Sequence, residues 1–496
     1  MSGSVIDSAR VFIDGEHIEA LCAPGQFGPA GYGTAPTLDL PGCDLLPGLM
    51  DLHNHLPYNV LPLWTVPMAY QNRNAWIGSA AYRRDVSQPM DALRRKGAVL
   101  RKALVRYVEV KLLLAGTTTV QGNGGSTHAG SPYRGLVRNL ELPDGPGIPV
   151  AGARVPDLRN DADRAELQAL LDTHRPCYFH LAEGLDAKAT AQFEALKQHG
   201  LVRRNLVCIH CLALDAQGHK QLAAASSRVV WSPLSNLLLY GQTLDPRQLH
   251  PPFAIGSDWS PSGSKNLLLE LKVAWLLGQE MQLGATLGFE ALARAVTVDA
   301  AGVAQCDGAL GSLAVGRLAD LLVLRRRHAD PFENLVRATE RDVQLVFIAG
   351  WPRYGAKVWM QAWGAASQAL EALDLHGQPM SLLLDQPGSP LQGLGLQQAM
   401  QSLEVALQGL GAPPVSPSAA LEGALGIGED SFDIELDLQA PQGPDVAADT
   451  LETAPLKSVP LDALTVVSDS GLLDRIAANV NAPPWLQGDA LRRMYK

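Results

Sequence analysis

Short apolar runs that end in a polar residue recur along the first half of the chain. The run Leu46–Met50 leads into Asp51, and later runs lead to His180, His210 and Asp258. Runs of this length are typical of strands that are buried on both faces, as in a parallel sheet. The pattern predicts strands that end near Asp51, Gln121, Glu141, Val155, Glu183, His210, Ser235 and Asp258.

Two histidines follow the first of these strands with one residue between them. Alternate side chains of a strand point to the same face, so His53 and His55 are expected to project together. A catalytic metal site usually needs about three protein ligands and an open position, and the later runs supply His180, His210 and Asp258 as further candidates. Metal-competent residues at the C-terminal ends of successive strands favour an α/β fold, a (β/α)8 TIM barrel with its active site at that rim.

The order of these residues resembles that of the amidohydrolase superfamily. His53-Asn54-His55, His180 with Glu183 three residues later, His210 and Asp258 carry the resemblance. It is strongest to the branch of cytosine, guanine and adenosine-type deaminases and s-triazine hydrolases. Further matching segments are Ala115–Val120, Trp231–Asn236 and Gly311–Val323.

The resemblance implies a division of the chain into three parts. Residues 1–45 and 306–355 are expected to pair into one small β-sandwich, and residues 46–305 to form the metal-dependent hydrolase barrel. Residues 356–496 lie beyond the family pattern and form a C-terminal extension. This extension is acidic, with no lysine or arginine between Val358 and Pro455. The net negative charge of the chain therefore belongs to this extension and does not indicate the charge of the substrate.

Within the extension, apolar spacing alternates with Pro-rich or acidic breaks. Helix-like spacing occurs over Lys357–Leu373 and Leu391–Leu410, whereas Ala412–Ser418 and Gln439–Pro455 are breaks typical of linkers. Residues Leu461–Ala478 are again apolar enough to dock, either on the chain's own barrel or on a partner. No ligand candidate lies beyond Asp258, so truncation near Ala419 is expected to spare the metal.

The residue types of the predicted site suit one divalent ion. Imidazoles of His53, His55 and His180 with the carboxylate of Asp258 fit zinc, with iron as the alternative. A water on such an ion has a pKa of roughly 7, so that metal-bound hydroxide is available for attack on a C–N bond. A single ion is favoured because the carboxylated lysine of binuclear relatives has no clear counterpart; Lys111 falls on an expected helix.

The resemblance also implies roles in proton transfer. Asp258 is expected to take the proton of the attacking water, and Glu183 to carry a proton to the leaving nitrogen or to a ring nitrogen. His210 is expected either to polarise the reacting carbon's substituent or to be a further ligand. The sequence does not decide between these two uses.

Three functions are compatible with this reading. The leading hypothesis is aminohydrolysis, or deamination, of a nitrogen heterocycle. The second is hydrolysis of an amide, a cyclic amide or a carbon–halogen bond by the same chemistry, because one fold hosts all of these. The third is a catalytically silent scaffold, which would predict lost ligands; every expected ligand is present.

Candidate substrate contacts follow the first two strands. Trp64 and Arg73 lie in the long segment after His55, and His128 follows the second strand. An aromatic ring beside arginine suits a flat polar substrate. The alternative is that Trp64 and Trp76 anchor the segment. Lys265, at the start of the helix after the last strand, is a weaker candidate for an acidic substrate group.

Composition indicates a large enzyme of a reducing compartment. With 496 residues and 47% apolar residues, the chain can bury a barrel core and a second layer. Its six cysteines are expected to be reduced, and Cys208 and Cys211 face opposite sides of a strand, which disfavours a zinc knuckle. The chain shows no signal-peptide pattern or membrane-length apolar run. We expect a cytoplasmic homo-oligomer, assembled in part through the extension, with a small-molecule substrate and no nucleic-acid or membrane partner.

Overall fold

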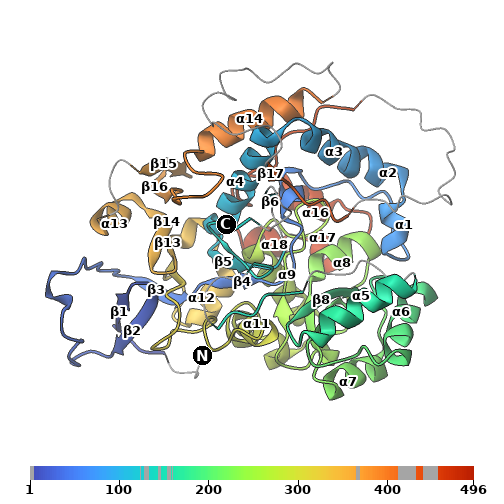
Figure 1. The fold of residues 1–496 in the computed structure, drawn as a ribbon, viewed down its shortest axis with the longest axis horizontal. Coiled ribbons are helices and arrows are strands. Elements are labelled where there is room, and N and C mark those ends of the chain that lie inside the picture. The colour runs from blue at the N-terminus through green and yellow to red at the C-terminus, as the bar shows by residue number, and fades with distance from the viewer. Residues whose placement is uncertain are drawn as a thin grey trace.

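In the computed structural model, short parallel strands alternate with helices, and an antiparallel sheet lies beside them (Figure 1). The structure describes residues 5–122, 125–127, 133–142, 147–152, 158, 160–364, 369–410, 432–438 and 456–496. The expected strand end at Val155 and the substrate candidate His128 lie outside these residues.

The parallel strands form two sheets. The first has the order β4-β5-β7 and contains β4 (Leu49–Asp51), β5 (Thr117–Val120) and β7 (Arg138–Asn139). The second has the order β11-β10-β9-β8 and contains β8 (Cys177–Leu181), β9 (Leu206–His210), β10 (Arg228–Trp231) and β11 (Ala254–Ile255). Parallel bridges near the sheet edges join Asn54 to Asp258 and Gly152 to Cys177.

Helices follow the parallel strands in chain order. They are α1 (Arg73–Ile77), α2 (Ala80–Tyr82), α3 (Gln88–Arg95), α4 (Ala98–Leu114), α5 (Asp161–Asp172), α6 (Ala187–Gln198), α7 (Ala216–Ala224), α8 (Pro233–Tyr240), α9 (Leu267–Glu280), α10 (Phe289–Ala295) and α11 (Val298–Val303). The strands end close to the predicted residues with one clear difference. Strand β10 ends at Trp231, and Ser235 lies in α8, because Pro233 stands at the helix start, where its fixed φ favours the first turn.

A six-stranded antiparallel sheet combines N-terminal and C-terminal strands, as the sequence predicted. Its order is β15-β16-β14-β13-β12-β3. The strands are β3 (Cys43–Pro47), β12 (Leu321–Arg325), β13 (Val343–Ile348), β14 (Trp351–Ala356), β15 (Leu370–Leu375) and β16 (Gln378–Leu383). A separate hairpin of β1 (Arg10–Asp14) and β2 (His17–Cys22) touches this region through a bridge from His17 to Leu318. Helix α12 (Pro331–Arg337) connects β12 and β13.

The sheet continues past residue 355, into the segment expected to begin the extension. Of the described residues in the helix predicted over Lys357–Leu373, Lys357–Ala362 is helical (α13), whereas Leu370–Leu375 is strand β15. The helix prediction is therefore wrong from Leu370 onwards. His376 and Gly377 connect β15 to β16 with φ of 58° and 77°, which is the two-residue turn that matches the twist of a hairpin.

Other described parts of the extension pack on the same chain. Helix α14 (Leu396–Gln408) lies against α4, where orange and blue helices cross in Figure 1. Helices α16 (Leu472–Ala477), α17 (Pro484–Gln487) and α18 (Ala490–Arg493) follow near the C-terminus. Leu472, Ile476 and Leu491 are buried in one apolar cluster with Leu238 of α8 and Leu269 of α9. The sequence left open whether the C-terminal part docks on its own chain or on a partner. In the structure, it docks on its own chain.

The six cysteines all fall within the described residues, and each has a free thiol. Among the helices of the described chain, we find none with the length and apolar character needed to span a membrane.

Acid is expected to weaken the fold through His219, a buried residue of α7. Burial, the largest cause, and His250 lower the pKa of His219 to about 4. A folded pKa below the unfolded value of about 6.5 means that stability is lost as the pH falls from 6.5 towards 4. Relative to the parent, His219→Gln should gain roughly 2 kcal/mol between pH 7 and pH 5. Urea unfolding of both proteins at both pH values measures this gain. The prediction would be contradicted if the difference in unfolding free energy between variant and parent were the same at pH 7 and pH 5.

Candidate metal site at the strand ends

Five polar side chains meet where the parallel strands end. His53 and His55 follow β4, His180 lies in β8, His210 is the last residue of β9, and Asp258 follows β11. All five are buried. Carboxyl ends of parallel strands face one edge of the sheet, which explains how residues far apart in sequence reach one place.

Asp51 fixes the loops that carry two of these residues. Its carboxylate accepts hydrogen bonds from Ser257 Oγ at 2.5 Å, Ser257 N at 3.0 Å and Asn54 Nδ2 at 3.0 Å. Burial is the main influence and raises the pKa of Asp51 to about 6, although these hydrogen bonds oppose the rise. The backbone N–H of Asp258 also donates to the carbonyl of His53 at 2.9 Å. The first and last parallel strands are therefore tied together directly beneath the candidate ligands.

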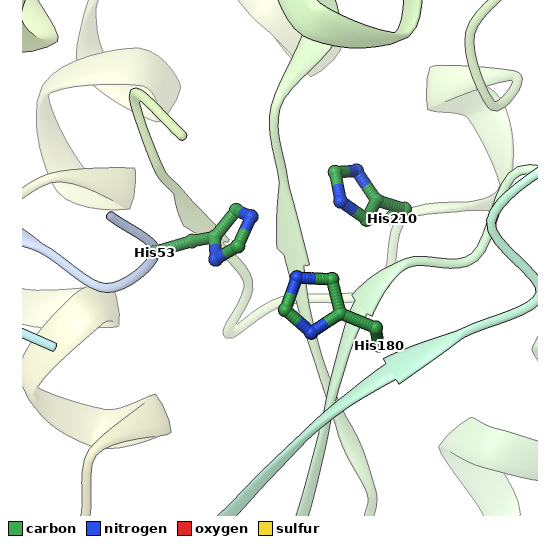
Figure 2. A group of neighbouring side chains, drawn as sticks. All are labelled: His53, His180 and His210. Carbon is green, nitrogen blue, oxygen red and sulfur yellow. The ribbon is translucent and has the colours of Figure 1, made fainter. Parts of the chain in front are cut away.

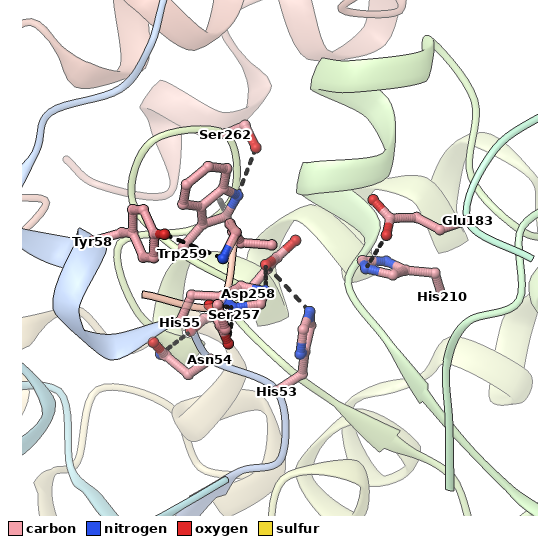
Figure 3. Close-up of polar contacts among 12 residues, drawn as sticks. His53, Asn54, His55, Tyr58, Glu183, His210, Ser257, Asp258, Trp259 and Ser262 are labelled. Atoms are coloured by element: carbon pink, nitrogen blue, oxygen red, sulfur yellow. Dashed lines mark hydrogen bonds and ion pairs between the residues drawn. The ribbon is translucent and has the colours of Figure 1, made fainter. Parts of the chain in front are cut away.

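The spacing of the donor atoms fits a divalent ion. Nε2 of His53 lies 3.2 Å from Oδ1 of Asp258, and Nε2 of His55 lies 3.3 Å from the same oxygen (Figure 3). Ligands bound at 2.0–2.1 Å around a tetrahedral ion are about 3.3 Å apart. The donor set of neutral imidazole and carboxylate is also one that zinc accepts.

A second group of ligand atoms shares His53. His53, His180 and His210 each offer a ring nitrogen, and these atoms lie within 4.8 Å of one another. Figure 2 shows the three rings turned towards a common point. The structure thus brings together all four predicted ligands, and adds His210 to them.

His210 is held in a form suited to a ligand. Its Nδ1 lies 2.9 Å from Oδ1 of Asn236, so the proton is expected on Nδ1 and the lone pair of Nε2 faces the site. Burial lowers the pKa of His210 against the opposing effect of Glu183, and this favours the neutral ring.

The backbone at the strand ends is strained. Four non-glycine residues near the site have left-handed φ values: Ala182 at 52°, His210 at 69°, Cys211 at 53° and Asp258 at 64°. Each such residue costs about 1–3 kcal/mol and persists only where its surroundings fix it. At these positions, side chains turn inwards from a strand end.

Glu183 stands beside the ligands and is held by residues of the surrounding helices. The Tyr240 hydroxyl donates to its Oε1 at 2.7 Å, and Trp76 Nε1 donates to the Tyr240 oxygen at 2.8 Å. Its other oxygen, Oε2, is 3.6 Å from Arg73 Nε and 3.8 Å from His210 Nε2. Oε2 is buried and has no hydrogen-bond partner in the part of the chain that the structure describes. One oxygen is therefore fixed while the other faces the site.

The two described substrate candidates differ in position. Trp64 is buried, its ring stacks on Tyr70 at 6.1 Å between centroids, and its backbone N–H donates to the carbonyl of Pro261. Its indole nitrogen has no hydrogen-bond partner among the described residues. These are the contacts of a loop anchor. Arg73 instead lies beside Glu183, at the edge of the site. Trp76 acts on the site through Tyr240.

The lysines considered from the sequence both face the C-terminal extension. Lys265 Nζ donates to Asp462 Oδ1 at 2.5 Å, and Lys111 Nζ donates to Asp462 Oδ2 at 2.6 Å. Lys111 also donates to the carbonyl of Asn59 and to Ser260 Oγ. Lys265 is therefore committed to an internal ion pair, and Lys111, placed on a helix as expected, is buried rather than solvated.

Three residues at the site were missed by the sequence interpretation. Tyr240 holds Glu183, Asp462 neutralises two lysines, and Asp437 lies 2.9 Å from Nδ1 of His55. The last contact joins positions 382 residues apart. Only the apolar alternation around Asp437, in Phe432-Asp-Ile-Glu-Leu-Asp-Leu438, marks it as an ordered segment within an acidic region.

Comparison with known proteins agrees with this geometry. Residues 158–352 match the model described as the amidohydrolase family. A 5-methylthioadenosine/S-adenosylhomocysteine deaminase 1 of Syntrophus aciditrophicus is 29% identical over 194 residues, which span 35% of this chain and 44% of the relative. A deaminase of the same description from Syntrophobacter fumaroxidans is 26% identical over 393 residues, covering 70% of this chain and 88% of the relative.

A solved structure shows the same fold. An adenosine deaminase of Xanthomonas campestris with bound zinc superposes with a TM-score of 0.56 at 22% identity, covering 71% of this chain and 89% of the other. The resemblance predicted from the histidine and aspartate motifs is confirmed over residues 158–352, the part of this chain that matches the amidohydrolase family model.

Proposed function

We propose that the protein is a metal-dependent aminohydrolase that releases ammonia from the amino-bearing ring carbon of a nitrogen heterocycle. The observation that carries the proposal is the convergence of four histidines and Asp258. Beside them lies Oε2 of Glu183, which accepts no hydrogen bond from the described residues. The relatives' names indicate an adenine-type ring as the first substrate to test.

The site is proposed to hold one divalent ion, zinc, through His53, His55, His180 and Asp258, with His210 as a further ligand. When bound, the ion would supply a water whose pKa is lowered to roughly 7. A single ion is preferred because Lys111, the only lysine considered for a bridging role, is hydrogen-bonded to Asp462 instead.

The chain's own residues account for the proton transfers of deamination. Asp258 takes a proton as water adds to the ring carbon, and Glu183 delivers a proton to the ring or to the leaving amino group. As the C–N bond breaks, the added hydroxyl passes its proton through these carboxylates to the amino group, so ammonia leaves and a ring carbonyl remains. Both protons of the water then stand on the ring nitrogen and the ammonia. Tyr240 keeps Glu183 in place during this exchange because it holds Oε1 and leaves Oε2 for the substrate.

The scaffold for this site is proposed to be one closed (β/α)8 barrel. The parallel bridges from Asn54 to Asp258 and from Gly152 to Cys177 support closure, since they link the two parallel sheets near both edges. The division into composite sandwich, barrel and extension, and assembly as a homo-oligomer in the cytoplasm, stay predictions.

Metal loading and ammonia release test the proposal together. The purified protein should bind close to one zinc or iron per chain, and the loaded protein should release ammonia from an adenine nucleoside, guanine or cytosine. Chelation should abolish release, and a single added metal should restore it. Two tightly bound metals would contradict the single-ion site. A loaded protein that releases no ammonia from this panel, but cleaves amides, would replace deamination by amide hydrolysis.

A further inference from the structure

We propose that Asp437, contributed by the C-terminal extension, is a positioning residue that holds His55 as a metal ligand. This inference rests on the proposed function, because it concerns the same site. It adds a residue from a part of the chain that lies outside the family match at residues 158–352.

The contact is directed at the ring nitrogen that does not face the other ligands. Both carboxylate oxygens of Asp437 lie close to Nδ1 of His55, at 2.9 and 3.0 Å. The opposite nitrogen, Nε2, is the one that lies 3.3 Å from Asp258 Oδ1. A carboxylate at Nδ1 keeps the proton there, leaves the lone pair of Nε2 for an ion, and makes the ring a stronger donor.

The carboxylate belongs to a segment that is anchored without it. We call residues 432–438 the inserted segment. Its backbone pairs with Ser126 and Thr127 through β17 (Phe432–Asp433), and Tyr82 donates to the carbonyl of Leu438 at 2.7 Å. The Leu438 N–H donates to the Tyr58 hydroxyl oxygen at 3.2 Å.

Side-chain burial fixes the inserted segment further. Phe432, Ile434, Leu436 and Leu438 are all buried, so alternate residues face the core. Asp437 lies between two of these buried side chains, and its own side chain is only 18% exposed. These contacts hold the inserted segment in place without Asp437, and they position its carboxylate beside His55. The ion pair therefore follows from the packing of the segment and is not what holds the segment there.

Charge distinguishes this arrangement from the support of His210. Asn236 offers His210 Nδ1 a neutral acceptor, whereas Asp437 offers His55 an anion. A negative charge close to a ligand stabilises bound cation as well as the ligand's orientation. Loss of the charge should therefore weaken metal binding even when the hydrogen bond survives.

Substitution Asp437→Asn isolates that charge, and Asp433→Asn is its matched control. Asp433 lies in the same segment but pairs with Arg94 at 2.5 Å, with both side chains more than two-fifths exposed. Both variants lose one negative charge from the inserted segment. Only Asp437→Asn loses it at His55.

The measurement is the affinity of metal-free protein for Co²⁺ and Zn²⁺ against a competing chelator. Asp437→Asn should bind about 10- to 100-fold more weakly than the parent, and Asp433→Asn within about 2-fold of it. Equal affinity of Asp437→Asn and parent, or an equal loss in Asp433→Asn, would overturn the inference. Thermal unfolding of the metal-free proteins checks that each variant folds.

A second variant pair tests the route through His55. In a His55→Ala background, Asp437→Asn should have a much smaller effect on Co²⁺ affinity, because only the direct attraction between the carboxylate and the ion is left to lose. An undiminished effect would show that Asp437 acts independently of His55 and overturn the assignment. A parent that binds neither metal would overturn the proposed function together with this inference. A metal-binding, active parent whose affinity is unaffected by Asp437→Asn would overturn the inference alone.

Discussion

Replacement of Glu183 by glutamine is expected to lower kcat by about 10² to 10⁴ without loss of the metal. Glu183 belongs to neither group of candidate ligand atoms, and its Oε2 lies 3.8 Å from His210 Nε2, so it stands beside the cluster rather than within it. Glutamine keeps the side chain's size and can still accept the hydrogen bond from Tyr240. What it removes is the capacity to hold and release a proton at Oε2.

The measurement is steady-state turnover on a substrate established by ammonia release, with metal content determined in parallel. Glu194→Gln is the control, because Glu194 forms an exposed pair with Lys197 on α6. The control should keep parental kcat. A Glu183→Gln protein with full metal and parental turnover would remove Glu183 from the proton route and leave Asp258 and His210 to carry it.

Removal of the Asp462 carboxylate is expected to destabilise the protein by about 3–5 kcal/mol. Asp462 and both lysines that bind it are buried, with donor distances of 2.5 and 2.6 Å. Burial by itself raises the pKa of Asp462, but Lys111 and Lys265 outweigh it and hold the pKa below its usual value. The Asp462→Ala variant would leave two ammonium groups without their shared counter-charge.

Urea unfolding at pH 7 measures this loss, with Asp474→Ala as the control. Asp474 lies in the same C-terminal region and pairs with Arg492 at 2.7 Å, but its side chain is 69% exposed. Exposed pairs contribute about 0–1 kcal/mol, so the control should unfold close to the parent. Equal effects of the two substitutions would show that the Asp462 cluster is no stronger than a surface pair.

The parts of the site that the sequence predicted are those coded by local pattern. A short apolar strand followed by histidine or aspartate indicates both the element and the position of a candidate ligand. His53, His55, His180 and Asp258 could therefore be grouped from their places at strand ends together with the family resemblance. His210 was identified in the same way. Its contact with Asn236, which leaves Nε2 facing the site, required the structure.

The parts that were missed depend on long-range contacts or on competing local signals. Asp437 and Asp462 belong to segments whose own sequences carry no sign of what they face. The apolar spacing of residues 370–383 is compatible with both a strand and a helix. The two-residue turn at His376 and Gly377 favours the hairpin. The expectation that truncation near Ala419 spares the metal also changes, because truncation would remove both Asp437 and Asp462.

The Asp462 ion-pair cluster has a consequence for the order in which the protein matures during synthesis. Lys111 leaves the ribosome 351 residues before the aspartate that neutralises it. Domains generally begin to fold while the chain is still being made, at about 5–20 residues per second. For tens of seconds, a nascent chain therefore contains the ligand-bearing strands and the two lysines, but not the aspartate that neutralises these lysines. The packing of Lys111 and Lys265, with the segments that carry Asn59 and Ser260, is therefore expected to be completed late, after residue 462 has emerged.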